Sequence, residues 1–396
     1  AVVLLPSYFK GEIYTAYQVL EKRFGGATQK AASVLFLVTR NLSSGLRLLL
    51  AAKVLELITN WGMPASIIVI GTSTIVYTYL GGIKAVVWTD VIQFVIYLVG
   101  AGVAMAILGD NVSGGWTAIL QRADAAGKLR VFDFGLDLTQ PYTFWAGVIG
   151  GLVLDTGTHG TDQMMVQRYL SARSERQAAG ALVASGFVIL VQFAVFLVIG
   201  LGLYALFQDA PPPVTLEPDK RFAYFIIHYL PHGVLGLVVA AVFSVTMSTL
   251  SGSLSASASS TVNDLYRPLV PLADEAHLLR LSKTLTAVWG VVQMAIAFGA
   301  IGLKDNVVNN ALAVASFITG ILLGLFLLGI LTKRVGQNAA LVGLLAGVAT
   351  VSYAKFGTPL AWPWYALVGS ATVVAVGLLV SLAAPRAKPE AWLSEL

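Results

Sequence analysis

Nine stretches of this sequence run for close to the length of a membrane span, or longer, without one Asp, Glu, Lys or Arg. They cover 57–83, 91–109, 138–154, 177–208, 222–263, 284–303, 306–332, 335–354 and 356–385. A helix needs about 20 apolar residues to cross the hydrocarbon core of a bilayer. The stretches are much longer than strands and show no alternation, so they predict spanning helices rather than barrel strands.

The composition supports a membrane protein. Hydrophobic residues make up 57% of the 396 residues, charged residues only 11%, and the mean hydropathy is +0.79. A soluble domain carries about 25% charged residues, so too few polar side chains exist here to cover a surface that faces water. This excludes a soluble enzyme, a nucleic-acid-binding module and a disordered scaffold. The chain contains no Cys, which excludes disulfides and thiolate chemistry.

We expect one membrane-embedded domain over 1–396 with about ten spanning helices. The expected spans are 28–58, 63–80, 85–108, 142–170, 176–207, 234–262, 278–302, 307–332, 337–356 and 361–384. Lys and Arg are about twice as frequent in alternate loops, which predicts a cytoplasmic C-terminus in a plasma (inner) membrane. Residue 1 is Ala rather than Met, and Ala1–Phe9 resembles the end of a helix, so we expect the natural protein to begin upstream.

A stripe of hydroxyl groups occupies one face of the span 234–262. Its members recur at steps of three and four: Ser244, Ser248, Ser251, Ser255 and Ser259. Small residues of this kind support close helix packing. Hydroxyl and carbonyl oxygens are also suitable ligands for a small hard cation. The pattern alone leaves both interpretations open.

Asp90 is a carboxylate inside an expected span, where a charge costs about 2.5–3.5 kcal/mol even on the mildest scale. It could pair with Lys84 at the membrane boundary. It could instead be a ligand for a cation or a proton near the hydroxyl stripe.

The segment 155–163 places two carboxylates, a His and two Gly inside an otherwise apolar stretch. It reads Asp-Thr-Gly-Thr-His-Gly-Thr-Asp-Gln. Helix propensity is poor here, and irregular backbone at membrane depth is tolerated only where it lines a cavity. Broken helices of this kind mark binding sites in secondary transporters. The alternative is that the span ends near Thr156 and a loop follows.

Arg47 lies within the first expected span, with Ser43, Ser44 and Gly45 just before it. Its planar guanidinium matches a carboxylate, which could belong to the protein or to a bound solute. Glu56 is about 13 Å away along a helix, too far for a direct pair. We predict that Arg47 faces the cavity at the break and bonds to neither Asp155 nor Asp162, so that a solute carboxylate is its partner.

The segment Gly81–Gln93 (GGIKAVVWTDVIQ) resembles a signature of the sodium/solute symporter family, and so does Gly160–Arg168 (GTDQMMVQR). Shorter matches follow the same order along nearly the whole chain: 13–15, 20–25 and 324–329. The resemblance implies a leucine-transporter-type fold of two inverted repeats, with its first core helices missing. Residues 1–108 would be the remainder of the first repeat, 142–332 the second repeat, and 337–384 peripheral helices.

The resemblance also implies functional residues. A sodium site would use the Ser248 and Thr249 hydroxyls with the Val245 carbonyl. A second cation site, found in some members, would use Asp90, Ser248 and Ser251; Gly252 stands where those members have Ser. Substrate contacts would come from Arg47 and from the broken helix, and Met164 would be the inner gate. The substrate set is Arg47, Asp155, Thr158, His159, Asp162 and Gln163.

The function implied is sodium-coupled symport of a small organic solute, and Arg47 favours a carboxylate. Sodium would be the coupling ion, with no other cofactor and no enzymatic activity. The partners would be the solute, sodium and the lipid bilayer, without nucleic acid; the oligomeric state is not indicated. Alternatives are a neutral or zwitterionic solute (a sugar or an amino acid), a sensor or scaffold that does not transport, and a pore.

Overall fold

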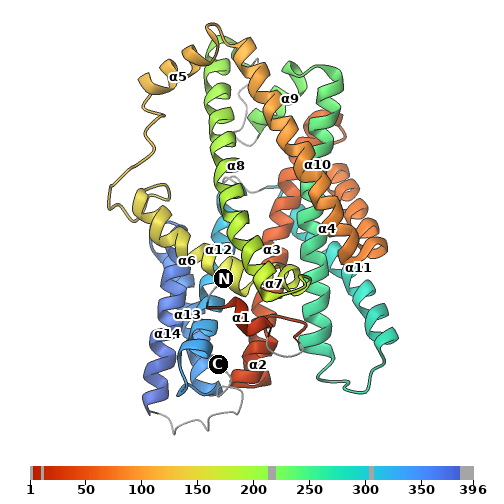
Figure 1. The fold of residues 1–396 in the computed structure, drawn as a ribbon, viewed down its shortest axis with the longest axis vertical. Helices are drawn as coiled ribbons and strands as arrows, with labels where there is room; N and C mark the ends of the chain where they lie inside the picture. Colours follow the sequence, from red (N-terminus) through yellow and green to blue (C-terminus); the bar gives the residue numbers. More distant parts are fainter. Residues whose placement is uncertain (1–2, 10–12, 213–219, 303–306, 384–396) are drawn as a thin grey trace.

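The computed structural model describes residues 3–9, 13–212, 220–302 and 307–383, with the side chains of 81–87, 89, 241 and 307 excepted. Within this part of the chain, nine helical segments are long and apolar enough to cross a membrane. Most run along the long axis of the molecule, and the broken helix α6–α7 lies among them (Figure 1). The predicted all-helical membrane fold is confirmed.

The helices follow one another in a simple order. The first group is α1 (Leu5–Tyr8), α2 (Gln18–Phe24), α3 (Gly26–Thr59), α4 (Met63–Asn111) and α5 (Gly115–Ala125). The middle group is η1 (Ala146–Gly150), α6 (Gly151–Thr161), α7 (Gln163–Leu170), α8 (Glu175–Asp209) and α9 (Arg221–Tyr229). The last group is α10 (His232–Ser260), η3 (Thr261–Tyr266), α11 (Glu275–Gly299), α12 (Val307–Leu331), α13 (Gln337–Gly357) and α14 (Pro363–Ala383).

Two expected boundaries differ in the structure. The expected spans 63–80 and 85–108 belong to one continuous helix, α4, because Gly81 and Gly82 do not end it. The expected span 142–170 is divided instead, into η1, α6 and α7. It is interrupted at Asp162, whose backbone is extended (φ −78°, ψ 121°). The described residues therefore hold nine long apolar segments rather than ten, of which α4 supplies two, Met63–Leu80 and Asp90–Asn111.

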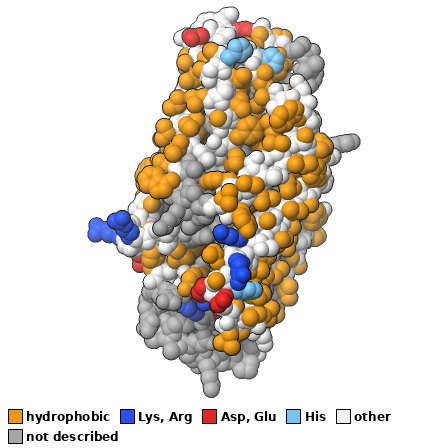
Figure 2. Space-filling view, turned by 90° about the vertical axis from the view of Figure 1, so that its right-hand side faces the viewer, with side chains coloured by type: hydrophobic (Ala, Val, Ile, Leu, Met, Phe, Trp, Pro, Cys, Tyr) orange, Lys and Arg blue, Asp and Glu red, His pale blue; other side chains and the backbone are white. Residues whose placement is uncertain are grey.

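The helix α3 lies at the centre of the bundle and packs against α4, α10, α11 and α12. One apolar core joins α1, α2 and α3 to α12, α13 and α14. A second joins α3, α4, α10 and α11, and a third joins α4 and α5 to α8, α9 and α10. Hydrophobic and uncharged side chains cover a broad band of the surface between charged groups near the upper end and in the lower half (Figure 2), as expected for a face in contact with lipid.

Helices α12, α13 and α14 approach each other closely at positions occupied by glycine. A Cβ atom added at Gly320 of α12 would lie 2.3 Å from the carbonyl oxygen of Ala366 in α14. At Gly343 of α13 it would lie 2.7 Å from the Val373 carbonyl oxygen. Small residues therefore allow backbone contact between these helices, which is how many membrane helices associate.

We expect Gly320→Ala to destabilise the protein by about 1–3 kcal/mol, because the new methyl group overlaps a backbone atom that has no free direction to move. The measurement is the melting temperature in detergent, taken from the fraction of protein that stays monodisperse after heating. Gly186→Ala is the matched control, since Gly186 lies in helix α8 with nothing within 4 Å of its added Cβ. Equal melting temperatures for the two variants would contradict the packing argument.

Candidate functional site

A cavity of about 210 Å³ lies between α3, α6 and α12, next to the interruption at Asp162. The structure brings four of the predicted substrate residues to its wall: Arg47, Asp155, Thr158 and Asp162. Arg40 and Ser43 of α3 also line it, and sequence reasoning gave neither a role. The remaining wall is mostly apolar and includes Phe36, Leu154, Ile318 and Leu322.

An ion pair joins α3 to the interrupted helix. Arg40 Nη1 lies 3.0 Å from Asp162 Oδ2, and the side chains are only 10% and 15% exposed. The other oxygen of Asp162 accepts a hydrogen bond of 2.8 Å from the backbone N–H of Met164. Asp162 is therefore the N-cap of α7 as well as the partner of Arg40. A carboxylate is favoured at that position because the first N–H groups of a helix have no partner within it.

Arg47 lies seven residues after Arg40, two helical turns along the same face of α3. It is half-buried, and none of the ion pairs or hydrogen bonds found among the described residues includes it. Asp155, at the same cavity, is exposed. The seven-residue spacing places both arginines on one face of α3, so the sequence could have indicated that Arg40 lines the cavity too. The spacing does not show which arginine pairs with Asp162.

Two more atoms of this wall are buried without a hydrogen-bond partner among the described residues, Arg40 Nε and Ser43 Oγ. Unpaired buried polar groups are rare in native structures because each one costs free energy. Together with Arg47 they give the cavity a set of unused donors. These donors suit an acceptor-rich solute.

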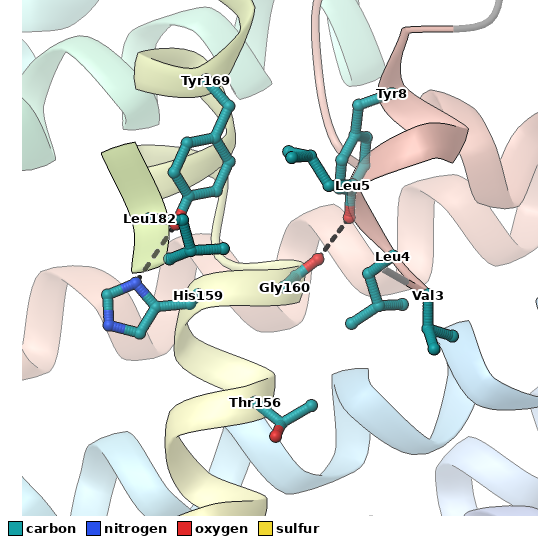
Figure 3. A pocket seen from close by; sticks show the side chains of 9 residues that line it. All are labelled: Val3, Leu4, Leu5, Tyr8, Thr156, His159, Gly160, Tyr169 and Leu182. Atoms are coloured by element: carbon teal, nitrogen blue, oxygen red, sulfur yellow. Dashed lines mark hydrogen bonds between the residues drawn. The ribbon is translucent and has the colours of Figure 1, made fainter. Parts of the chain in front are cut away.

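His159 and Gln163 do not line this cavity. His159 points to a second cavity of about 200 Å³ beside α1, where its Nδ1 lies 3.1 Å from the Tyr169 hydroxyl and where Tyr8 donates to the Gly160 carbonyl (Figure 3). One residue along a helix turns the side chain by about 100°, so His159 and Thr158 face different ways.

The side chain of Gln163 is held by the segment that precedes α2. Its Oε1 accepts from the Ala16 N–H at 2.6 Å, and its Nε2 donates to the Tyr14 carbonyl at 3.1 Å. Thr15, between these two residues, donates to the buried carboxylate of Asp264. Asp264 also accepts from Gln29, Ser33 and Ser260.

The serines of α10 divide between two faces of the helix. Ser253, Ser257 and Ser260 are buried against α3 and α11, and the hydroxyl of Ser253 accepts from Ser44 at 2.8 Å. These serines pack helix against helix, but they are not members of the predicted stripe. On the predicted stripe, Ser248 donates to Asp90, and Ser251 donates to the Ser248 carbonyl at 3.0 Å.

The three predicted sodium ligands lie within one turn of α10. Thr249 Oγ1 donates to the Val245 carbonyl at 3.1 Å. Val245 and Thr249 border a third cavity of about 280 Å³, and Arg47 borders it too. Arg47 therefore contacts both this cavity and the one beside Asp162.

Among the described side chains, Asp90 has two partners, one for each carboxylate oxygen. Ser248 donates to Oδ1, and Arg168 Nη2 of α7 lies 3.3 Å from Oδ2. The side chain of Lys84, the partner considered from the sequence, lies outside the described residues. Met164, the predicted gate, is buried and its sulfur accepts from Arg40 Nη2.

The pair between Arg40 and Asp162 predicts a large stability effect. Removing one partner of a buried pair costs about 3–5 kcal/mol because the other charge stays behind. We expect Arg40→Gln to lower the melting temperature strongly, and Arg40→Gln with Asp162→Asn to recover part of the loss. Arg122→Gln is the control, since its pair with Asp209 is 28% exposed on both sides and worth at most about 1 kcal/mol. Similar melting temperatures for Arg40→Gln and Arg122→Gln would contradict this assignment.

Comparison with known proteins agrees with this architecture. The model of the sodium:solute symporter family matches residues 1–347. Sodium-coupled monocarboxylate transporter 2 of Bos taurus is 33% identical over 90% of this chain and 58% of its own length. The human sodium/iodide cotransporter is 31% identical over 91% of this chain and 57% of its own length. The chain thus spans a little over half of these relatives.

A solved structure of a Na⁺-coupled sialic acid symporter, in a substrate-bound outward-open state, has the same fold. It superposes with a TM-score of 0.87 at 25% identity and covers 98% of this chain and 81% of its own. The leucine-transporter-type fold predicted from the sequence is confirmed. The family match extends over most of the chain, and its residues form the interrupted helix and the cavities described above. This chain belongs to the sodium:solute symporter family.

Proposed function

We propose that this chain provides the solute and ion sites of a sodium-coupled symporter for a small organic anion, a carboxylate by preference. The observation that carries the proposal is that two neighbouring arginines differ in whether a carboxylate of the protein pairs with them. Arg40 is neutralised by Asp162, whereas Arg47 lines the same cavity and enters into no ion pair among the described residues. A guanidinium within a membrane span costs at least about 2.5–3.5 kcal/mol unless something compensates it.

A bound carboxylate would compensate Arg47 in both charge and shape. Its two oxygens match the fork of the guanidinium in two parallel charge-assisted hydrogen bonds. Ser43 Oγ and Arg40 Nε, which have no partner among the described residues, offer further donors on the same wall. The relatives support an anion, because their names specify monocarboxylates, iodide and sialic acid.

Sodium would bind at Val245, Ser248 and Thr249, whose carbonyl and hydroxyl oxygens suit a hard cation. Arg47 borders this place as well as the solute cavity. A carboxylate bound to Arg47 would offset its positive charge and so ease the binding of sodium nearby. By linkage, sodium would promote solute binding to the same degree. One net charge that crosses 100 mV contributes about 2.3 kcal/mol, roughly 50-fold accumulation, so with a monoanionic solute the membrane potential would act only through sodium ions beyond the first.

The organisation predicted from the sequence belongs to this proposal. Residues 1–108 and 142–332 would be parts of two repeats, and 337–384 would be peripheral. The protein would lie in the plasma membrane with its C-terminus in the cytoplasm, since Lys and Arg predominate in the loops on that side.

The class of solute can be tested directly. We expect L-lactate, pyruvate or propionate to raise the melting temperature of the purified protein in sodium but less in potassium. The matching neutral amides, such as lactamide, should have little effect because they lack the charge that Arg47 compensates. Equal stabilisation by an acid and its amide would remove the basis for an anionic solute.

Arg47→Lys tests the role of the fork. The variant keeps the charge but loses the two parallel hydrogen bonds, so solute affinity should fall about 10- to 100-fold, which corresponds to about 1.5–3 kcal/mol for a hydrogen bond to a charged group. Half-saturation by solute and by sodium should be measured in proteoliposomes. The sodium value, measured at saturating solute, should change little. Unchanged solute affinity would show that Arg47 does not bind the solute.

Ser248→Ala with Thr249→Ala tests the sodium site and should give the reverse pattern. The sodium concentration for half-maximal uptake should rise at least several-fold, because two hydroxyl ligands are lost. Solute affinity at saturating sodium should stay near that of the unsubstituted protein. Unaltered sodium dependence in a well-folded double variant would place the ion elsewhere.

A further inference from the structure

The connection between α5 and η1 exposes large apolar side chains at every second residue. From residue 132 onward these are Phe132, Phe134, Leu136 and Leu138. The two phenylalanines are 58% and 59% exposed and stack on each other at 5.9 Å between ring centroids, and Leu136 is 77% exposed. Residues 130–137 form neither helix nor strand, and they run along the left edge of the molecule from α5 to α6 (Figure 1).

The acidic side chains between these apolar ones are held by groups of the same segment. Asp133 Oδ1 accepts from Arg130 Nη2 at 3.0 Å and from the Gly135 N–H at 3.1 Å. Asp137 Oδ1 accepts from the N–H and the hydroxyl of Thr139 at 2.9 and 2.7 Å. Asp133 is half-buried and so less exposed than the phenylalanine on either side of it. A loop surrounded by water would show the reverse order, and contiguous exposed apolar side chains mark a surface that contacts protein or membrane.

Aromatic contacts fix this segment to the start of η1. The ring of Phe144 lies 4.8 Å from that of Phe134 and 5.9 Å from that of Phe132, between centroids. The Phe144 N–H donates to the Asp133 carbonyl at 2.7 Å, and the Trp145 ring packs edge-on against Phe144. The exposed apolar side chains therefore form a surface of defined shape, joined to the helix that lines the cavity beside Asp162.

The same segment lies at the level where two membrane spans end. The Leu138 carbonyl accepts from the Ala361 N–H at 2.9 Å, in the connection between α13 and α14. Both helices are long and apolar enough to cross the bilayer, so their connection marks one of its boundaries. Trp145, Trp364 and Leu136 border an apolar cavity of about 160 Å³ under the segment. Tryptophan is enriched at this level of membrane proteins because its ring is apolar and its N–H polar.

We propose that the segment 131–138 is an interfacial anchor, whose apolar side chains lie where the lipid headgroups meet the acyl chains of the bilayer. Burial of apolar surface drives binding at this depth. Between residues 128 and 139 two basic side chains, Lys128 and Arg130, balance two carboxylates, so the anchor carries no net charge. It therefore suits a zwitterionic lipid such as phosphatidylcholine and does not require an anionic one. Because Phe144 joins the anchor to η1, the membrane surface would help to hold the beginning of the interrupted helix.

Spin labels can test this placement, because the chain contains no Cys and a single introduced Cys carries the only label. The variants are Phe132→Cys, Phe134→Cys and Leu136→Cys, each labelled with a nitroxide in phosphatidylcholine nanodiscs. Collisions of the label with oxygen, which concentrates in lipid, and with a water-soluble nickel chelate should be measured by electron paramagnetic resonance. All three labels should collide often with oxygen. They should collide with nickel at least several-fold less than a label at Asp137→Cys, the polar neighbour.

Two reference positions calibrate the measurement. Leu345→Cys, in the middle of α13 at a residue that is 64% exposed, reports lipid, and Glu275→Cys, at a side chain that is 83% exposed, reports water. Nickel collisions at all three anchor positions as frequent as at Glu275→Cys would place the segment in water and overturn the proposal. Few collisions with either reagent would overturn it too, because a protein surface, such as a second copy, would then cover the segment. Each position reports separately, and no step requires transport, so the result is independent of the proposed symport.

Discussion

The ion pair between Arg40 and Asp162 is the interaction that lets this chain interrupt a helix among its membrane spans. Unpaired backbone groups are expensive away from water, so a break there needs partners for its exposed N–H groups. Asp162 supplies one through its hydrogen bond to Met164 N, and Arg40 compensates the carboxylate charge that makes this cap strong. The cavity beside the break, the position of α7 and the reach of Arg168 to Asp90 all depend on it.

Two pairs therefore fix the short helix α7 at its ends. Asp162 at its start is held by Arg40 of α3, and Arg168 near its end is held by Asp90 of α4. Both pairs are formed within the protein, which leaves Arg47 as the cavity's available positive charge. It lines two cavities, one beside Asp162 and one beside Thr249, so its charge acts on both.

Much of this could be predicted from the sequence because it depends on local patterns. The long uncharged stretches predicted the spans. The cluster of Gly and carboxylates near 160 predicted the interruption, and the three- and four-residue spacing predicted the helix face that contains Ser248. The family motifs, carried by the same segments, predicted the fold. These features depend on residues close together in the chain.

The rest required tertiary contacts. Arg40 and Arg47 share one face of α3, and only the position of α6–α7 decides that Asp162 meets Arg40. Thr158 and His159 are adjacent in sequence, yet the rotation along α6 turns only Thr158 to the cavity beside Asp162. The continuity of α4 through Gly81 and Gly82 was also unpredictable, because helix propensity is a weak guide once neighbouring helices pack against a segment.

The contacts of Gln163 have a mechanical consequence. Its side chain holds the backbone at Tyr14 and Ala16, while Thr15, between them, is held by the buried carboxylate of Asp264. This short segment thus connects α7 to the contact between α3 and η3. Any displacement of α7 away from α3 must either move this segment with it or break several hydrogen bonds together. A movement of α7 would then have a high activation enthalpy and a steep dependence on temperature, although neither Gln163 nor Thr15 lines the cavity beside Asp162.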